Sequence, residues 1–282
     1  MTAAARKAAV TGHPVAHSRS PLIHGYWLKK FGINGEYGCL DIEPDDADRF
    51  FRTFSESGLT GANVTVPHKE IAAAACDRLD EAAKVMGAAN TIWLDDAGRL
   101  CGANTDWTGF LGNLDQRAPG WDDDPGTAIV LGAGGAARAI VFALLSRKFK
   151  AVHIVNRTPE KAAKIAEEFG SRTFAHSWDN LGTLLEEAGL VVNTTTLGMT
   201  GKPPLKVDLS PLPQSALVTD AVYVPLQTDL LKQAEQRGNR TVDGLGMLLH
   251  QAVPGFERWF GVRPEVDDDL RALIVRDLGG AK

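Results

Sequence analysis

The feature that most constrains the fold is a glycine-rich turn between two apolar segments, AIVLGAGGAARAIVFALL (128–145). Gly132, Gly134 and Ala137 match the pattern GxGxxA. In such a turn the first glycine permits a tight bend, and the second lets backbone N–H groups approach a pyrophosphate. The small third residue keeps strand and helix close. The segment therefore predicts a strand, a dinucleotide-binding turn and a helix, with a purely structural turn as the alternative.

The segment after the next apolar run indicates which dinucleotide would bind. In NAD-binding proteins the second strand usually ends in Asp or Glu, which accepts a hydrogen bond from the ribose 2′-hydroxyl. Here AVHIV (151–155) is followed by Asn156, Arg157 and Thr158, with Lys161 one turn later. Arg and Lys favour a 2′-phosphate, so NADP is the expected cofactor. The alternative is that both cations are solvated surface charges.

The rest of the chain alternates short apolar runs with helical patterns, which is typical of α/β proteins. Its 282 residues suggest about two domains. We expect an N-terminal α/β substrate domain (1–104), a Rossmann-type NADP-binding domain (105–243), and C-terminal helices (244–282) that return to the first domain. The buried strands of the second domain should be parallel.

Individual elements follow from apolar periodicity, caps and turn residues. Strands are expected at 8–10, 61–66, 88–94, 98–103, 127–131, 151–155, 190–193 and 216–223. Helices are expected at about 22–31, 44–58, 67–86, 105–116, 135–145, 159–169, 177–188, 228–237, 245–260 and 266–278.

Composition excludes several classes of function. Thirty Lys and Arg against 35 Asp and Glu give a formal charge of −5, so nucleic acid is not an expected partner. Cys39, Cys76 and Cys101 form no CxxC pair and have no close His, which favours a reduced, cytoplasmic setting and no metal site. The amino-terminal segment lacks the apolar stretch of a secretion signal, and no membrane span is expected.

A group of polar residues in the first domain suggests a small-molecule site. Asn63 and Thr65 should share one face of a strand, with Lys69 shortly after them. Two hydrogen-bonding side chains beside an ammonium could bind a polyhydroxylated or carboxylated compound. The alternative is an ordinary turn followed by an exposed lysine. Further polar residues lie at loops or strand ends, namely Ser18, Ser20, Asn90 and Asp106. The nearby histidines His13, His17, His24 and His68 show no metal-ligand spacing and are interpreted as structural.

Five separated segments together resemble the shikimate dehydrogenase family in order and spacing. They are AHSRSP (16–21), NVTVPHK (63–69), AANT with GANTD (88–91, 102–106), GAGGAAR with NRT (132–138, 156–158) and DGLGMLLHQA (243–252). The resemblance implies NADPH-dependent, reversible reduction of 3-dehydroshikimate to shikimate, a step of chorismate and aromatic amino-acid biosynthesis. It also implies a split substrate domain completed by the C-terminal helices.

The resemblance also implies residue roles. Lys69 would be the general acid/base, paired with Asp106, and Ser18 and Ser20 would hold the substrate carboxylate. The other implied substrate contacts are Asn63, Thr65, Asn90, Tyr223 and Gln251. The implied cofactor-binding residues are Gly132, Ala133, Gly134, Gly135, Ala136, Asn156, Arg157, Thr158, Lys161, Thr195, Met199, Gly244 and Met247, with Gly246 beside them. The chain departs from the family at Trp107, where many members have Gly, and at Leu197, where a small polar residue is common.

Two other functions remain open. A dual quinate/shikimate dehydrogenase would usually favour NAD and relax the pocket around the serines. A non-catalytic NADP-responsive protein would keep the fold without turnover, but binding alone requires neither Lys69 nor Asp106. The sequence leaves a homodimer possible.

Overall fold

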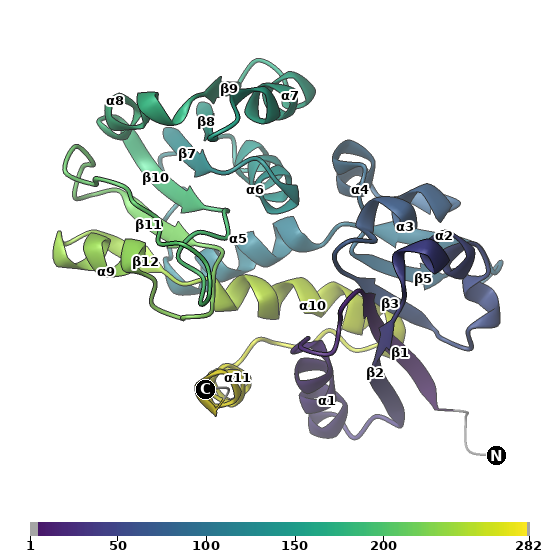
Figure 1. Ribbon diagram of the computed structural model, residues 1–282. Helices are drawn as coiled ribbons and strands as arrows, with labels where there is room; N and C mark the ends of the chain where they lie inside the picture. The colour runs from purple at the N-terminus through teal and green to yellow at the C-terminus, as the bar shows by residue number, and fades with distance from the viewer. Residues whose placement is uncertain (1–4, 281–282) are drawn as a thin grey trace. The chain divides into compact units, whose positions relative to one another are not determined.

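The computed structural model describes residues 5–280 and divides the chain into two compact units (Figure 1). Unit 1 is the chain up to Thr105 together with the chain from Gln251 onward, and unit 2 is Asp106–His250. Residues 1–4, part of the segment considered for a secretion signal, lie outside the described residues.

The end of unit 2 differs from the expected domain boundary at residue 244. Residues 244–250 belong to unit 2 because they pack closely on its first helix, α5 (Asp106–Arg117). A Cβ atom on Gly112 would lie 2.7 Å from the ring of His250, and one on Gly246 would overlap Asn113.

Unit 2 is built on a six-stranded parallel sheet. Its strands are β7 (Thr127–Leu131), β8 (Ala151–Val155), β9 (Thr173–His176), β10 (Ala188–Asn193), β11 (Leu217–Asp220) and β12 (Arg240–Val242). They lie in the order β12-β11-β10-β7-β8-β9, and every neighbouring pair is parallel. This is the strand order of a Rossmann fold, in which the chain moves outward from β7 to one edge and then from β10 to the other.

Alternation along the strands gives this sheet two apolar faces. Val130, Val152 and Ile154 face α5 and α6 (Gly135–Ser146), where they join Phe110 and Ile140 in one core. The intervening strand residues form a second core with α8 and α9 on the opposite face. This second core includes Ile129, Leu131, Val155, Leu185 and Leu231. The remaining helices of unit 2 are α7 (Pro159–Phe169), α8 (Leu181–Leu185) and α9 (Asp229–Gln236), with one short 3-10 turn, η2 (Trp178–Asn180).

Unit 1 contains a mixed six-stranded sheet in the order β2-β1-β3-β5-β6-β4. Its strands are β1 (Arg6–Gly12), β2 (Gly35–Asp41), β3 (Gly61–Val64), β4 (Arg78–Leu79), β5 (Thr91–Leu94) and β6 (Leu100–Ala103). β1 is parallel to β2 and β3, whereas β5 is antiparallel to β3 and β6. Its N-terminal helical elements are α1 (Ser20–Lys30), α2 (Pro44–Arg52), η1 (Phe54–Glu56), α3 (Lys69–Ala75) and α4 (Glu81–Met86).

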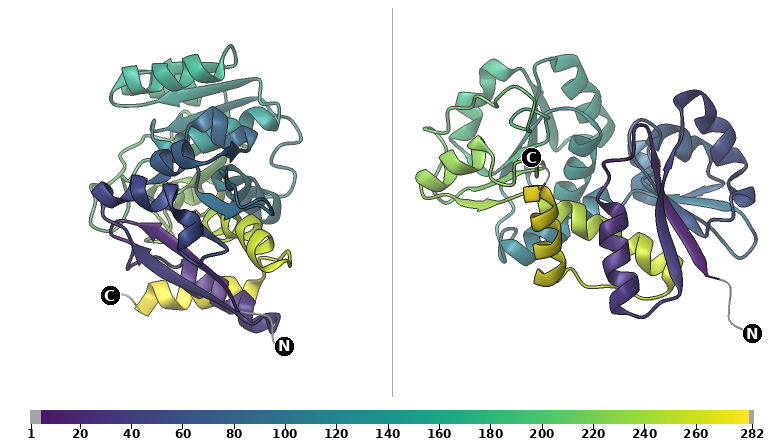
Figure 2. Two further views of the ribbon diagram at one scale, coloured as in Figure 1. Left: turned by 90° about the vertical axis from the view of Figure 1, so that its right-hand side faces the viewer. Right: turned by 60° about the horizontal axis from the view of Figure 1, so that its bottom comes forward.

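The carboxyl-terminal residues complete the core of unit 1. Trp259, near the end of α10 (Leu245–Phe260), is fully buried and donates its indole N–H to the carbonyl of Ile92 at 3.0 Å. A Cβ atom on Gly61 would overlap the same indole, so β3 and Trp259 are in close contact. Figure 2 shows the purple α1 beside the yellow α11 (Asp268–Gly280), and Arg19 pairs with Asp277 at 2.8 Å.

The α/β prediction with a parallel second sheet is confirmed, and four local predictions are wrong. The helix expected at 177–188 is the turn η2 followed by α8, and β10 already begins at Ala188. β3 ends at Val64, so Thr65 lies in the following turn instead of on the strand. The helix expected at 67–86 is two helices, because the carboxylate of Asp77 binds the backbone N–H of Leu100 and that of Asp80 caps α4. The 44–58 helix ends at Arg52 and continues as η1. The edge strands β2, β4, β9 and β12 were not predicted.

None of the helices within residues 5–280 has the length and apolar character needed to cross a membrane.

Candidate active site

The glycine turn of unit 2 lies where the strand order reverses. Gly132 follows β7 with φ of 108°, in the region that favours glycine. A Cβ atom there would lie 2.7 Å from Thr194 Oγ1 and 3.0 Å from Thr195 Cγ2. Thr194 itself donates its backbone N–H to the carbonyl of Leu131 at 2.8 Å. The loops after β7 and β10 are thus in contact, and such a switch point is where open parallel sheets bind ligands.

The N-terminus of α6 fits a pyrophosphate. Gly134 is its N-cap and makes no side-chain cap hydrogen bond, so the first-turn N–H groups can receive an anion. A Cβ atom on Gly134 or Gly135 would have no protein atom within 4 Å. Both glycines are exposed, so their missing side chains leave open space at the helix end. Arg138 points elsewhere, since it pairs with Glu168 of α7.

The segment after β8 fits a 2′-phosphate better than a free 2′-hydroxyl. Arg157 and Lys161 are exposed, and within residues 5–280 neither forms an ion pair. Asn156 donates through Nδ2 to the carbonyl of Thr158 at 2.8 Å, which fixes this turn. Thr158 occupies the N-cap of α7, although its hydroxyl makes no cap hydrogen bond.

A buried polar network that the sequence analysis missed shapes the loops after β10 and β11. Asn193 donates to Asp220 at 2.8 Å and accepts from the backbone N–H and hydroxyl of Thr195 at 3.0 and 2.8 Å. The other Asp220 oxygen accepts from Thr228 at 2.7 Å. Burial raises the pKa of the Asp220 carboxyl despite these hydrogen bonds. The sequence signal was available, because Asn193 and Asp220 each end an apolar strand run.

The same loops carry two further predicted residues. The backbone N–H of Thr200 donates to the carbonyl of Val224 at 2.8 Å, which joins the segment that follows Met199 to the one that follows Tyr223. Tyr223 lies in unit 2, whereas the other predicted substrate contacts lie in unit 1.

Close packing leaves no room for a side chain at Gly244 or Gly246. A Cβ atom on Gly244 would lie 2.6 Å from the backbone of Asp220 and Ala221, and one on Gly246 would overlap Asn113. Met247 is partly buried against the core on the α5 side of the sheet. These contacts explain the glycines without a ligand, so their cofactor role stays a prediction.

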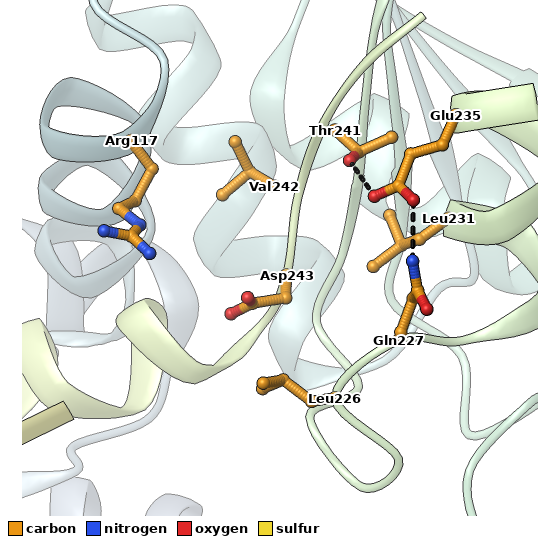
Figure 3. A pocket seen from close by; sticks show the side chains of 8 residues that line it. All are labelled: Arg117, Leu226, Gln227, Leu231, Glu235, Thr241, Val242 and Asp243. Carbon is orange, nitrogen blue, oxygen red and sulfur yellow. Dashed lines mark hydrogen bonds between the residues drawn. The ribbon is translucent and has the colours of Figure 1, made fainter. Parts of the chain in front are cut away.

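A pocket of about 410 Å³ opens in unit 2 beside β12, an edge strand of the sheet (Figure 3). Within it the carboxylate of Glu235 accepts from Gln227 at 2.6 Å and from Thr241 at 2.8 Å. Its lining contains none of the predicted site residues. The lining residues are Arg117, Leu226, Gln227, Leu231, Glu235, Thr241, Val242 and Asp243.

In unit 1 the two predicted carboxylate-binding serines lie at the start of α1. Ser20 is its first residue and is buried, and its backbone N–H donates to Ser18 Oγ at 3.2 Å. Ser18 is held in turn by its own N–H, which donates to the carbonyl of Val15 at 3.0 Å. Two hydroxyls and a helix N-terminus therefore gather at one place, an arrangement suited to an anion.

A second group of predicted residues is joined by hydrogen bonds inside unit 1. Asn90 Oδ1 accepts from the backbone N–H of Thr105 at 2.7 Å, and Asn90 Nδ2 donates to Gln251 Oε1 at 3.4 Å. The hydroxyl of Thr105 donates to the backbone carbonyl of Gln251 at 2.8 Å. Asn63 joins the group through Thr91, whose hydroxyl accepts from Asn63 Nδ2 at 3.2 Å. Asn63, Asn90 and Gln251, far apart in the sequence, are therefore neighbours.

The predicted catalytic residues sit at helix starts next to these groups. Lys69 is the first residue of α3, and its carbonyl accepts from the backbone N–H of Ala89, the neighbour of Asn90. Asp106 is the first residue of α5 in unit 2 and follows Thr105 directly in the chain. Thr65 is fixed by its backbone N–H, which donates to the carbonyl of Thr11 at 2.8 Å.

The histidines near these segments have structural surroundings. His68 is buried and contacts the carbonyl of Ile42 at 2.6 Å, and His13 pairs with Asp41 at 2.7 Å. Within the described part of the chain no group of three or more His, Cys, Asp or Glu is placed to hold a metal ion.

Three family models match the chain in the order of these features. The shikimate dehydrogenase substrate-binding domain matches residues 10–92, shikimate/quinate 5-dehydrogenase matches 121–199, and the shikimate 5′-dehydrogenase C-terminal domain matches 244–274. A curated relative, shikimate dehydrogenase (NADP(+)) of Azorhizobium caulinodans, is 58% identical over 273 residues, covering 97% of each chain. The chain belongs to the shikimate dehydrogenase family. The resemblance seen in the five sequence segments is confirmed.

Solved structures of the shikimate dehydrogenase family share the fold. The Thermus thermophilus enzyme in complex with NADP(H) and shikimate has a TM-score of 0.82 at 34% identity, covering 97% of this chain and 99% of that one. Quinate dehydrogenase from Corynebacterium glutamicum in complex with NAD has a TM-score of 0.89 at 26% identity, with 96% and 99% covered. Similarity of the backbone therefore does not distinguish a shikimate dehydrogenase from a quinate dehydrogenase. The distinction must come from the side chains.

Proposed function

We propose that this protein catalyses the reversible, NADPH-dependent reduction of 3-dehydroshikimate to shikimate, in chorismate and aromatic amino-acid biosynthesis. Unit 1 would bind the substrate and unit 2 the cofactor. The observation that carries the proposal is that the chain contains two sets of residues. Unit 2 has a glycine turn followed by Arg157 and Lys161, and unit 1 has a group of hydroxyl and amide side chains. The relatives' names agree with this assignment.

The residues of unit 2 fit NADP. The N-terminus of α6, with open space at Gly134 and Gly135, would hold the pyrophosphate. Arg157 and Lys161 would bind the 2′-phosphate, which the ribose of NAD lacks. When bound, the nicotinamide supplies the hydride for the ketone carbon.

The residues of unit 1 fit a polyhydroxylated carboxylate. Ser18 and Ser20 would hold the carboxylate through their hydroxyls at the start of α1. The amides of Asn90 and Gln251 would contact the ring hydroxyls. Asn90 is kept in place by its hydrogen bond to Gln251 and by the one it accepts from Thr105. Thr65 and Asn63 lie at the end of β3 and complete this surface, and Tyr223 would add a contact from unit 2.

Lys69 is the proposed proton donor. As the carbonyl carbon gains hydride, its oxygen gains negative charge, and a positioned ammonium both stabilises that charge and donates the proton. The products are a secondary alcohol, a neutral amine and the oxidised cofactor. Asp106 would orient the ammonium and accept a hydrogen bond from the neighbouring substrate hydroxyl. In the reverse direction Lys69 acts as the base.

One assay tests the function directly. NADPH oxidation is followed with 3-dehydroshikimate, in parallel with NADH, and the reverse reaction is run with shikimate and with quinate. We expect turnover with 3-dehydroshikimate and a clear preference for NADPH. Faster oxidation of quinate than of shikimate would favour the dual dehydrogenase, and cofactor binding without any turnover would favour a binding protein.

Replacing Lys69 tests the proposed mechanism. Lys69→Ala should lower kcat by about a hundredfold or more and change KM little, because the ammonium acts chiefly on the transition state. Lys84→Ala is the matched control, since Lys84 is an exposed lysine of α4 in the same unit. An unchanged kcat in Lys69→Ala would remove this residue from the chemistry.

A further inference from the structure

Tyr37, which no motif singled out, lies on β2 with its hydroxyl between two proposed substrate-binding residues. It donates to Asn63 Oδ1 at 2.7 Å. Burial raises the pKa of the Tyr37 phenol, and the side chain of Ser20 opposes this rise, so Ser20 lies near the phenol oxygen. A single hydroxyl is thus bonded to the amide group at the end of β3 and lies near the start of α1.

The hydrogen bond from Tyr37 decides which way the amide of Asn63 faces. A side-chain amide has one accepting end and one donating end, and its orientation follows its partners. Because Oδ1 accepts from Tyr37, the NH₂ group faces the carbonyl of Asn90 at 3.3 Å and the hydroxyl of Thr91 at 3.2 Å. Asn63 is only 4% exposed, so solvent offers no substitute partner.

The same orientation is passed on to Asn90. Thr91, which accepts from Asn63, donates its own hydroxyl to Asn90 Oδ1 at 3.1 Å. Asn90 Oδ1 also accepts from Thr105, so its Nδ2 faces Gln251. A series of hydrogen bonds therefore runs from the phenol hydroxyl through Asn63, Thr91 and Asn90 to Gln251.

The ring of Tyr37 is held from behind by His24. The two rings stack with centroids 3.9 Å apart and an interplanar angle of 9°. His24 is fully buried, and within residues 5–280 neither ring nitrogen has a hydrogen-bond partner. Burial lowers the pKa of His24 to about 3, so the imidazole is neutral and serves as a flat packing surface. The hydroxyl of Tyr37 consequently has little freedom to move.

We propose that Tyr37 is a positioning residue that sets substrate affinity by fixing Asn63 in its binding orientation. The proposal rests on the proposed function, because it takes Asn63 as a substrate contact. Tyr37 touches no reacting atom, so it acts on substrate binding and leaves the hydride step and the cofactor unaffected.

The experiment compares Tyr37→Phe with Tyr26→Phe and the unchanged protein. Phenylalanine keeps the ring and its stack on His24 and removes only the hydroxyl. Tyr26 is the matched control, because its hydroxyl also makes hydrogen bonds within unit 1, to Asp267 at 3.0 and 3.1 Å, but none to a proposed substrate contact. Steady-state oxidation of shikimate by NADP⁺, calorimetric shikimate binding and thermal unfolding are measured for all three.

We expect Tyr37→Phe to raise the KM and the Kd for shikimate about five- to twentyfold, since Asn63 loses its buried donor. Its kcat and its KM for NADP⁺ should stay within about twofold of the unchanged protein. Tyr26→Phe should leave all three kinetic constants unaltered, even if both variants unfold at a lower temperature. A lower Tm in Tyr37→Phe with normal shikimate affinity would assign the hydroxyl a structural role only and overturn the proposal.

A double-mutant cycle with Asn63→Ala asks whether the two residues act together. If Tyr37 acts through Asn63, the two losses of shikimate affinity are less than additive, whereas fully additive losses contradict that connection. The activity of the unchanged protein distinguishes a failure of the proposed function from a failure of the proposed role of Tyr37. If it fails to oxidise shikimate, the proposed function fails and this proposal with it, whereas an active protein with an unaffected Tyr37→Phe variant sinks this proposal alone.

Discussion

Replacing Gly132 by alanine should destabilise unit 2 far more than the same change at Gly134, although both belong to one glycine turn. Gly132 has φ of 108°, which an L-residue adopts only at a cost of about 1–3 kcal/mol. Its new Cβ atom would also lie 2.7 Å from Thr194 Oγ1. Thr194 cannot move away easily, because its hydroxyl and backbone N–H both donate to the carbonyl of Leu131, at 2.7 and 2.8 Å.

The magnitude follows from these two contributions. Overpacking in a rigid region typically costs about 1–3 kcal/mol, so Gly132→Ala should lose roughly 2–6 kcal/mol in the free energy of unfolding. For a unit of this size, that corresponds to a Tm lower by roughly 5–20 °C. At Gly134 φ is −106° and no protein atom lies within 4 Å of the new Cβ atom. Its only cost is that of alanine at an N-cap, about 1 kcal/mol or less.

Thermal unfolding by circular dichroism and the KM for NADPH are measured for both variants. Gly134→Ala should remain nearly as stable as the unchanged protein while its KM for NADPH rises about tenfold or more, because the Cβ atom occupies the place proposed for the pyrophosphate. Equal loss of stability in the two variants would refute the assignment of separate roles. A Gly134→Ala variant with unchanged NADPH affinity would refute the proposed pyrophosphate position.

Two further outcomes are expected. Arg157→Ala should raise the KM for NADPH about tenfold or more, through loss of a charge-assisted hydrogen bond, and leave the KM for NADH unchanged; an equal rise for both coenzymes would argue against 2′-phosphate recognition. Burial lowers the pKa of His24 to about 3 and that of His250 to about 4, from an ordinary 6.5. As the pH falls, these two histidines therefore become protonated in the unfolded chain before they do so in the folded protein. The free energy of unfolding falls by about 1.4 kcal/mol per pH unit for each histidine as the pH drops below about 6.5. Urea unfolding between about pH 7 and pH 5 checks this; His24→Phe should show a shallower slope, and an identical slope would contradict the prediction.

The central strands of both sheets could be predicted from the sequence, whereas the edge strands could not. The apolar runs at β7, β10 and β11 are buried on both faces, which gives a continuous signal. The four unpredicted strands, β2, β4, β9 and β12, are the four edges of the two sheets. An edge strand pairs on one side only and tolerates exposed residues, so its sequence carries less apolar pattern. β2, for example, has no buried residue along its length.

Short sequence motifs were enough to predict the site residues. They were not enough to predict the residues that hold those site residues in place. The predicted pair Ser18 and Ser20 does lie together, and Asn90 does lie beside Gln251. Tyr37 could not be assigned from the sequence, because it acts through a contact with Asn63, far away in the chain. Asp220 was missed although it ends an apolar strand run, because its partner Asn193 lies in another strand. The break in the helix predicted at 67–86 has the same cause, since Asp77 is held by the backbone of β6.

Trp107 and Leu197, the two departures from the family pattern, have local packing partners. The Trp107 ring lies edge-on to Phe142 of α6, with centroids 5.2 Å apart. Leu197 packs against the core on the α8 and α9 side of the sheet. Both larger side chains therefore fill space inside unit 2.

The way unit 1 is assembled from both ends of the chain has a consequence for biosynthesis. Unit 2 is one continuous stretch and has all of its residues as soon as its last helix turn has been translated. The part of unit 1 that precedes unit 2 leaves the ribosome much earlier than Phe256 and Trp259, which pack on Trp27 and β3. This earlier part therefore completes its core only after unit 2 has been synthesised, and part of its interior stays uncovered in the meantime.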